Sequence, residues 1–110
     1  MILVAGADAN GLGDALEALG VEVVRVTGVA TRESLDAAGL AEAHTLVLTD
    51  MDDASAIPVA KEANTEVRIV AYSRDSLPEF ARGQADLAID PDLLTPDVVA
   101  EELVDGRVEG

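Results

Sequence analysis

The stretch "GADANG", residues 6–11, has the outline of a phosphate-binding loop. It follows an apolar run, and Gly6 and Gly11 occupy the first and third glycine positions of such a loop. The backbone N–H groups at the start of the following helix could then bind a phosphate. Asp8 stands at the second glycine position, where its negative charge would repel that phosphate. We therefore expect Asp8 or Asn10 to cap the helix by accepting the N–H bonds that a phosphate would have taken.

The acidic stretch "TDMDD", residues 49–53, is a second candidate for chemistry. Carboxylates that follow a strand can bind Mg²⁺ or Ca²⁺. Asp50, Asp52 and Asp53 have no spacing that fixes a bidentate metal ligand. We expect them to cap a helix and to form a solvated acidic loop, and we predict no metal site.

The stretch "AYSRD", residues 71–75, follows another apolar run. Arg74 could meet an anionic ligand, or pair with Asp50 or Asp75, and pairing at the surface is the more frequent outcome. The chain has no cysteine and one histidine, His44, so no pair of nucleophile and base is visible. We therefore predict no catalytic residues and no enzymatic activity.

Short apolar runs alternate with amphipathic stretches along the whole chain. The runs at 2–5, 21–26, 45–49, 67–71 and 87–89 predict strands, and the first of them reads as buried on both faces. Predicted helices cover 11–19, 31–40, about 53–63, 77–84, and a last stretch that begins at 95–96 and stops at 105–106. Thr31, with Ser34 three residues later, and Thr95, before Pro96, are the expected caps of two of them.

This alternation predicts one domain, residues 1–110, with a doubly wound, five-stranded parallel sheet in the order 2-1-3-4-5. The class is a Rossmann- or flavodoxin-like three-layer α/β sandwich. Ligands in such sheets bind at the carboxyl ends of the strands, beside the switch between strands 1 and 3. The predicted ligand-binding residues are accordingly Gly6, Ala7, Asp8, Asn10, Gly11, Thr49, Asp50, Ser73 and Arg74. The identity of any cofactor stays open.

The charge of the chain is strongly negative. Twenty-two acidic residues face seven basic ones, of which only Lys61 is a lysine, and the formal net charge is −15. Spread acidity argues against nucleic-acid binding, which needs basic patches. Such a composition resembles that of cytoplasmic proteins from salt-accumulating archaea, and we predict that the protein loses structure at low salt. No apolar run is long enough to span a membrane, so we expect a cytoplasmic protein without membrane insertion.

In sequence the chain resembles the amino-terminal nucleotide-binding domain of potassium-channel and potassium-uptake regulators, the RCK or Trk-A amino-terminal type. The resemblance lies in "GADANG", "GVATRESLDAAGLAEAHTLVLTDMDD", "VRIVAYSRD" and "ARGQADLAIDPDLL". It implies a Rossmann fold, NAD(H), ATP or ADP in the crevice, pairing into a homodimer, and a partner such as a membrane transporter. The departures are Asp8, Val29 within "GVAT", and a missing strand–helix unit that leaves Thr27 where an acid would hold the ribose. They imply weak or lost dinucleotide binding.

Several functions remain open on this sequence. The main interpretation is a free-standing, non-catalytic regulatory or interaction domain. An alternative is a receiver-like phosphoacceptor module, since Asp50 and Ser73 follow strands 3 and 4, although Asp90-Pro91 follows strand 5 where a lysine is expected. A nucleotide-binding regulatory subunit, an enzyme with a Rossmann site and a purely structural homodimer are the others.

Overall fold

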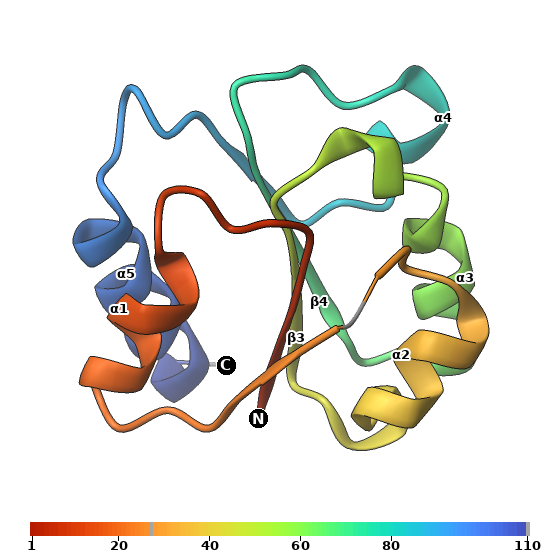
Figure 1. Cartoon of the computed structure of the whole chain (residues 1–110), viewed down its shortest axis with the longest axis horizontal. Helices are drawn as coiled ribbons and strands as arrows, with labels where there is room; N and C mark the ends of the chain where they lie inside the picture. Colours follow the sequence, from red (N-terminus) through yellow and green to blue (C-terminus); the bar gives the residue numbers. More distant parts are fainter. Residues whose placement is uncertain (27, 110) are drawn as a thin grey trace.

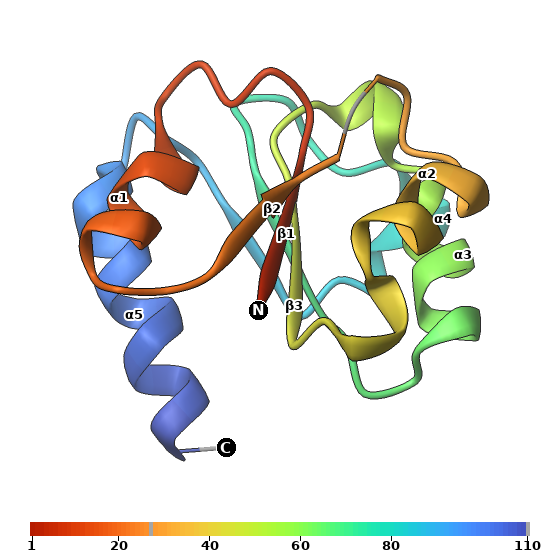
Figure 2. The ribbon, with the colours of Figure 1, turned by 60° about the horizontal axis from the view of Figure 1, so that its bottom comes forward.

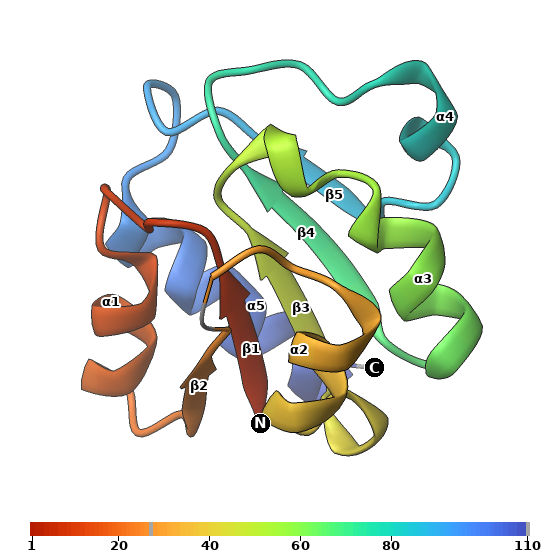
Figure 3. The same cartoon turned by 45° about the vertical axis from the view of Figure 1, so that its right-hand side comes forward.

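The computed structural model describes the backbone of residues 1–26 and 28–109, with side chains as far as Val104. Its strands are β1 (Ile2–Ala5), β2 (Val23–Arg25), β3 (Thr45–Leu48), β4 (Arg68–Tyr72) and β5 (Leu87–Ile89). They form one parallel sheet in the order β2-β1-β3-β4-β5, as Figure 3 shows. The predicted fold class is confirmed. Thr27, where the resemblance pointed to a missing ribose-binding acid, lies outside the described residues.

Helices cover both faces of the sheet. The α-helices are α1 (Leu12–Ala18), α2 (Arg32–Ala38), α3 (Ala56–Ala63), α4 (Glu79–Arg82) and α5 (Pro96–Glu109), and two 3₁₀ turns are η1 (Leu40–Glu42) and η2 (Met51–Asp53). Helices α1 and α5 lie on one face, whereas α2, α3 and α4 lie on the other (Figures 1 and 2). Among these described helices, none has the length and apolar character needed to cross a membrane.

The alternation of side chains along β1 explains why this strand is apolar throughout. Ile2 and Val4 pack into the cluster under α1 and α5, whereas Leu3 and Ala5 pack into the cluster under α2 and α3. All four side chains are therefore buried, as expected for a parallel strand with helices on both faces.

The boundaries of several helices differ from the predictions. Gly39 takes a φ of 101°, which ends α2 and starts the η1 turn, so the predicted helix 31–40 is two shorter elements. Helix α3 begins only at Ala56, after η2, and α4 is a single turn. Helix α5 continues to Glu109 through Gly106, because one glycine costs a helix only about 1 kcal/mol and does not prevent helical dihedrals.

Helices α2 and α5 begin directly after Thr31 and Thr95, the residues predicted to cap them. The Thr31 hydroxyl accepts the Ser34 N–H at 3.1 Å, and the Ser34 hydroxyl accepts the Thr31 N–H at 2.8 Å, which completes a capping box. Helix α5 begins at Pro96, and the Thr95 carbonyl accepts its first bond from Val99 at 3.0 Å. The predicted starts of both helices are confirmed.

Candidate functional site

The β1–α1 loop is closed on itself by Asp8. Its carboxylate accepts the Leu12 N–H at 2.9 Å and the Gly13 N–H at 2.8 Å. Its carbonyl accepts the Gly11 N–H at 2.9 Å, and its backbone takes a φ of 53°, in the left-handed region that aspartate tolerates. The predicted capping by Asp8 is confirmed, and the N–H groups of the helix start that a phosphate would use are already bonded.

Gly6 allows this loop to pack closely against the end of β3. A Cβ atom at Gly6 would overlap the Thr49 hydroxyl and lie 3.1 Å from the Asp50 nitrogen, and its φ is 95°. The Thr49 hydroxyl donates to the Ala5 carbonyl at 2.8 Å and accepts the Asp8 N–H at 3.0 Å. The first glycine of the motif is therefore required by the end of β3, without any ligand.

The aspartates after β3 have different roles in the structure. The Asp50 carboxylate accepts the Asp52 N–H at 2.9 Å and so caps η2, as predicted. Asp53 differs from the expected solvated residue, since it is only 8 % exposed and accepts the Ala30 N–H at 3.2 Å. It fixes the β2–α2 loop to the end of β3. Among the described residues, no three His, Asp or Glu side chains are arranged to hold a metal ion.

The residues after β4 also bond within the chain. Arg74 binds Asp92 through Nη2 and Nε, each 2.9 Å from Oδ1, rather than the predicted Asp50 or Asp75. This is pairing at the surface, as expected, because both side chains are 60 % exposed. The Ser73 hydroxyl accepts the Asp75 N–H at 3.1 Å. The partner of Arg74 could not be predicted, since Asp92 approaches it only through the fold.

Tyr72 is the residue at this edge that the sequence analysis missed. It is 2 % exposed, and its hydroxyl donates to the Leu94 carbonyl at 2.8 Å, across to the loop before α5. Burial raises the pKa of the Tyr72 phenol, and the negative charge of Asp8 raises it further, against a smaller opposing effect of Arg74. The available signal was an aromatic side chain at a strand end, in a chain with one tyrosine and one phenylalanine.

Most of the predicted site residues meet in one crevice. A cavity of about 360 Å³ is lined by seven of them, namely Ala7, Asp8, Asn10, Thr49, Asp50, Ser73 and Arg74, together with Tyr72 and Pro91 among others. Gly6 instead lines a neighbouring hollow with Val29 and the aspartates after β3. Gly11 lies at the start of α1 with a φ of 74°.

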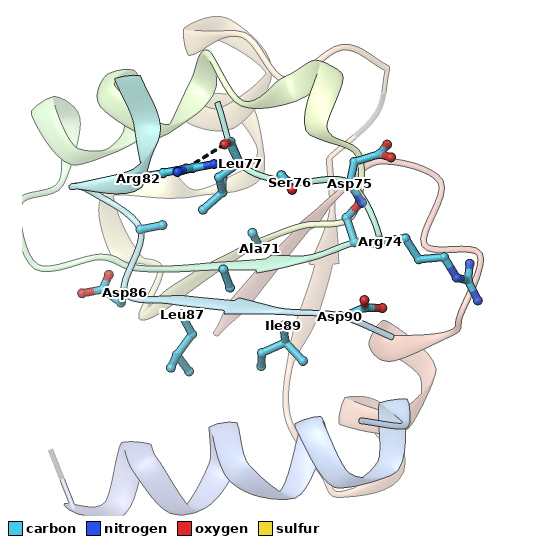
Figure 4. A pocket seen from close by; sticks show the side chains of 13 residues that line it. Ala71, Arg74, Asp75, Ser76, Leu77, Arg82, Asp86, Leu87, Ile89 and Asp90 are labelled. Atoms are coloured by element: carbon cyan, nitrogen blue, oxygen red, sulfur yellow. Dashed lines mark hydrogen bonds between the residues drawn. The ribbon is translucent and has the colours of Figure 1, made fainter. Parts of the chain in front are cut away.

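A third hollow, of about 410 Å³, lies between β4, β5 and α4. Figure 4 shows Arg74 extending away from its neighbours there, and Leu87 and Ile89 pointing to the opposite face, toward α5. Arg82 lines this hollow, and its Nε donates to the Leu77 carbonyl at 3.1 Å. The side chains of this hollow come mainly from the β5 edge of the sheet.

The one lysine of the chain lies at the opposite edge of the sheet. The Lys61 ammonium donates to the Val67 carbonyl at 2.8 Å and pairs with Asp86 at 3.1 Å, and both residues directly precede a strand. Burial raises the pKa of the Asp86 carboxyl, but the Ile69 N–H at 2.7 Å and Lys61 outweigh it, and the pKa ends below its ordinary value. Asp90, after β5, accepts the Asp92 N–H at 2.8 Å. No lysine therefore serves the crevice in the described chain.

Solved structures with this fold include three of note. A protein described as a pilus assembly protein (CpaE) from Burkholderia thailandensis is 20% identical, with a TM-score of 0.69, covering 97% of both chains. A pilus-assembly-related protein from Burkholderia pseudomallei is 20% identical, with a TM-score of 0.65, over 94% of this chain and 86% of that one. An orphan response regulator of H. pylori is 15% identical, with a TM-score of 0.71, over 96% and 94%.

These comparisons correct the resemblance to potassium-transport regulators. The neighbours are pilus-assembly and response-regulator proteins, and the RCK or Trk-A interpretation is wrong. Short segments of Gly, Ala and Asp recur in doubly wound sheets because each strand end needs a similar turn. Their order along the chain therefore indicates this fold class, and it does not identify a particular family. No curated protein matches the sequence. Residues 2–103 match one family model, and the chain belongs to that family of unknown function, DUF7126.

Proposed function

We propose that this chain is a receiver-like regulatory domain that acts by binding other proteins, without phosphorylation, nucleotide binding or catalysis. The fold likeness to a response regulator supports the receiver-like part of the proposal. The absence of phosphorylation and nucleotide binding is supported by the bonding of the polar groups in the crevice. Its principal polar groups are bonded within the chain, above all the Asp8 carboxylate on the N–H groups of Leu12 and Gly13.

Phosphorylation of an aspartate needs positive charge beside it, and the one cation that lines this crevice, Arg74, is already paired with Asp92. An incoming phosphoryl group carries negative charge, which a cation or a bound Mg²⁺ must offset. Asp50 is the candidate acceptor, but Lys61 lies at the other edge of the sheet, and Arg74 is paired with Asp92. Asp8 and Asp75 line the same crevice and add negative charge. A phosphoryl group on Asp50 would therefore meet repulsion.

Nucleotide binding meets the same obstacle. A pyrophosphate at the β1–α1 loop would have to displace the Asp8 carboxylate from two N–H groups, which are 2.8 and 2.9 Å away. It would also place like charges in contact within a partly enclosed site. Partner proteins would instead bind the outer surface of this domain.

Intact-mass spectrometry after incubation with acetyl phosphate and Mg²⁺ tests the proposal. A receiver domain known to accept phosphate from acetyl phosphate serves as the positive control, and the Asp50→Asn variant as the matched negative control. We expect the mass of this protein to stay unchanged while the positive control gains a phosphoryl group. A phosphoryl adduct that forms on the unaltered chain and disappears in Asp50→Asn would overturn the proposal.

A further inference from the structure

We infer that the corner where β5 leads into α5 docks a basic, amphipathic segment of a partner protein. This β5–α5 corner consists of three apolar side chains, Leu93, Leu94 and Val98, with the acidic residues around them. The inference rests on the proposed function, namely that the domain acts by binding proteins, and it names the surface and the chemistry of the partner.

The corner gathers apolar side chains that face solvent. Leu93 is 80% exposed, Val98 41% and Leu94 38%, all within six residues of sequence. The other exposed large hydrophobic side chains among the described residues, Leu19, Val29 and Phe80, come one each from separate parts of the chain. Single exposed apolar residues are ordinary, whereas three at one loop and helix start are candidates for an interaction surface.

The loop that presents these side chains is held in place. The Asp90 carbonyl accepts the Leu93 N–H at 2.9 Å and the Leu94 N–H at 3.2 Å. The buried Tyr72 hydroxyl holds the Leu94 carbonyl at 2.8 Å, and Arg74 holds Asp92. Two side chains from the end of β4 therefore tie down the loop. A surface that is already ordered loses less conformational entropy when a partner binds.

The charge around the corner selects the partner. Residues 90–104 contain five acidic side chains and no lysine or arginine, the acids being Asp90, Asp92, Asp97, Glu101 and Glu102, and the one cation that meets them is Arg74, already paired with Asp92. Glu101 and Glu102 are exposed and follow Val98 by three and four residues, so they share its face of α5. A partner with apolar anchors flanked by lysine or arginine complements this surface.

A second copy of the chain would complement the corner poorly. It would bring the same acids against one another, in a protein whose formal net charge is already −15. An acidic or phosphate-rich partner would be repelled for the same reason. We therefore assign the corner to a basic protein segment rather than to self-association.

The test is a titration of the ¹⁵N-labelled protein with a synthetic helical peptide that carries leucines on one face and lysines on the other. It is recorded at the lowest KCl concentration at which the protein is folded. We expect saturable shift changes centred on residues 89–102. A peptide with glutamates in place of the lysines should give none. Equal changes with both peptides, or changes centred on another surface, would overturn the inference.

Variants separate docking at the corner from general attraction between opposite charges. The triple variant Leu93→Ser, Leu94→Ser, Val98→Ser should bind the peptide at least about tenfold more weakly, because it removes the apolar anchors. The matched control Leu19→Ser, Val29→Ser alters exposed side chains elsewhere and should bind normally. Equal weakening in both variants would overturn the inference. Retained dispersion of each ¹⁵N spectrum shows that the variant is folded.

Two further outcomes separate this inference from the proposed function. Light scattering that finds a dimer, lost in the triple variant, would assign the corner to a second copy and overturn the inference. Phosphorylation of Asp50 would overturn the proposed function and leave the peptide map unchanged. Peptide binding at another surface would overturn the inference while the proposed function stands.

Discussion

The crevice at the carboxyl edge of the sheet and the β5–α5 corner use their side chains in opposite ways. In the crevice, Asp8, Thr49, Asp50 and Arg74 all bond to partners within the chain. At the corner, Leu93 is 80% exposed and Val98 is 41% exposed, and both are apolar. Proteins with this class of sheet bind ligands in the crevice, yet here the apolar side chains left exposed as a group lie at the corner. The difference shows that the position of a site in a fold does not establish what the site does.

Tyr72 connects the two regions. Its buried ring lies at the end of β4 and lines the crevice, and its hydroxyl holds the loop that carries Leu94. Residues of the crevice should therefore matter mainly for stability, those of the corner mainly for binding, and Tyr72 for both. Four variants test this division.

The largest loss of stability is expected for Gly6→Ala. The new Cβ would overlap the Thr49 hydroxyl at a φ of 95°, and the loop would have to move away from β3. We expect a loss on the order of 3 kcal/mol in the free energy of unfolding. Gly20→Ala is the matched control, because Gly20 has a φ of 84° but nothing within 4 Å of its added Cβ. Denaturant unfolding of both variants isolates the cost of the overlap, and equal losses would argue against close packing of the β1–α1 loop on the end of β3.

Asp8→Ala should have the next largest effect. It leaves the N–H groups of Leu12 and Gly13 without their carboxylate partner and places alanine at a φ of 53°. We expect the free energy of unfolding to fall by about 2 kcal/mol. Asn10→Ala, in the same loop but exposed, is the control and should change stability little. A neutral Asp8→Ala would mean that the carboxylate is available for another role.

The third effect concerns alkaline pH and Tyr72. The folded protein favours the neutral phenol, so its pKa in the folded state is above that in the unfolded state. The stabilisation is therefore complete below about pH 10, and it is lost as the pH rises through the folded-state pKa. Tyr72 is the one tyrosine of the chain, so tyrosinate absorbance reports it alone.

Tyr72→Phe should flatten the alkaline fall in stability and weaken peptide binding less than the triple variant does. The rest of the ring is retained, so the neutral-pH stability should fall by only about 1 kcal/mol. A tyrosinate that forms at the pH of a free tyrosine would contradict the buried contact with Leu94.

The smallest effect on stability is expected at the corner. Leu93→Ser changes the most exposed of the three apolar side chains, which is 80% exposed, so the free energy of unfolding of this variant should stay within about 0.5 kcal/mol of the original. Thermal and denaturant unfolding measure this directly. A substantial loss would show that this side chain serves the fold, and the contrast between the two regions would disappear.

The sequence predicts the fold well because each strand is a short apolar run between turn residues. It also predicts the cap by Asp8, since the carboxylate lies a few residues from the N–H groups that it bonds. Contacts over long sequence distances were not predictable. Arg74 with Asp92, Tyr72 with Leu94, and Asp53 with Ala30 depend on which loops the fold brings together.

The other inferences from the sequence stay predictions. The structure does not test the loss of structure at low salt, the homodimer, the transporter partner, the single domain or the cytoplasmic location. Of these, the transporter partner followed from the resemblance that the comparisons correct. Circular dichroism in dilute buffer and in molar KCl tests the salt dependence that the net charge of −15 implies.

The central claim is that the polar groups of the crevice are already bonded to partners within the chain. A ¹⁵N titration with Mg²⁺ and acetyl phosphate tests it most directly, through the amide signals of residues 6–13 and 49–52. We predict that these signals stay in place, and that the bonded amides of Leu12 and Gly13 do not respond. Saturable shifts of the crevice amides that vanish in Asp50→Asn would contradict the account.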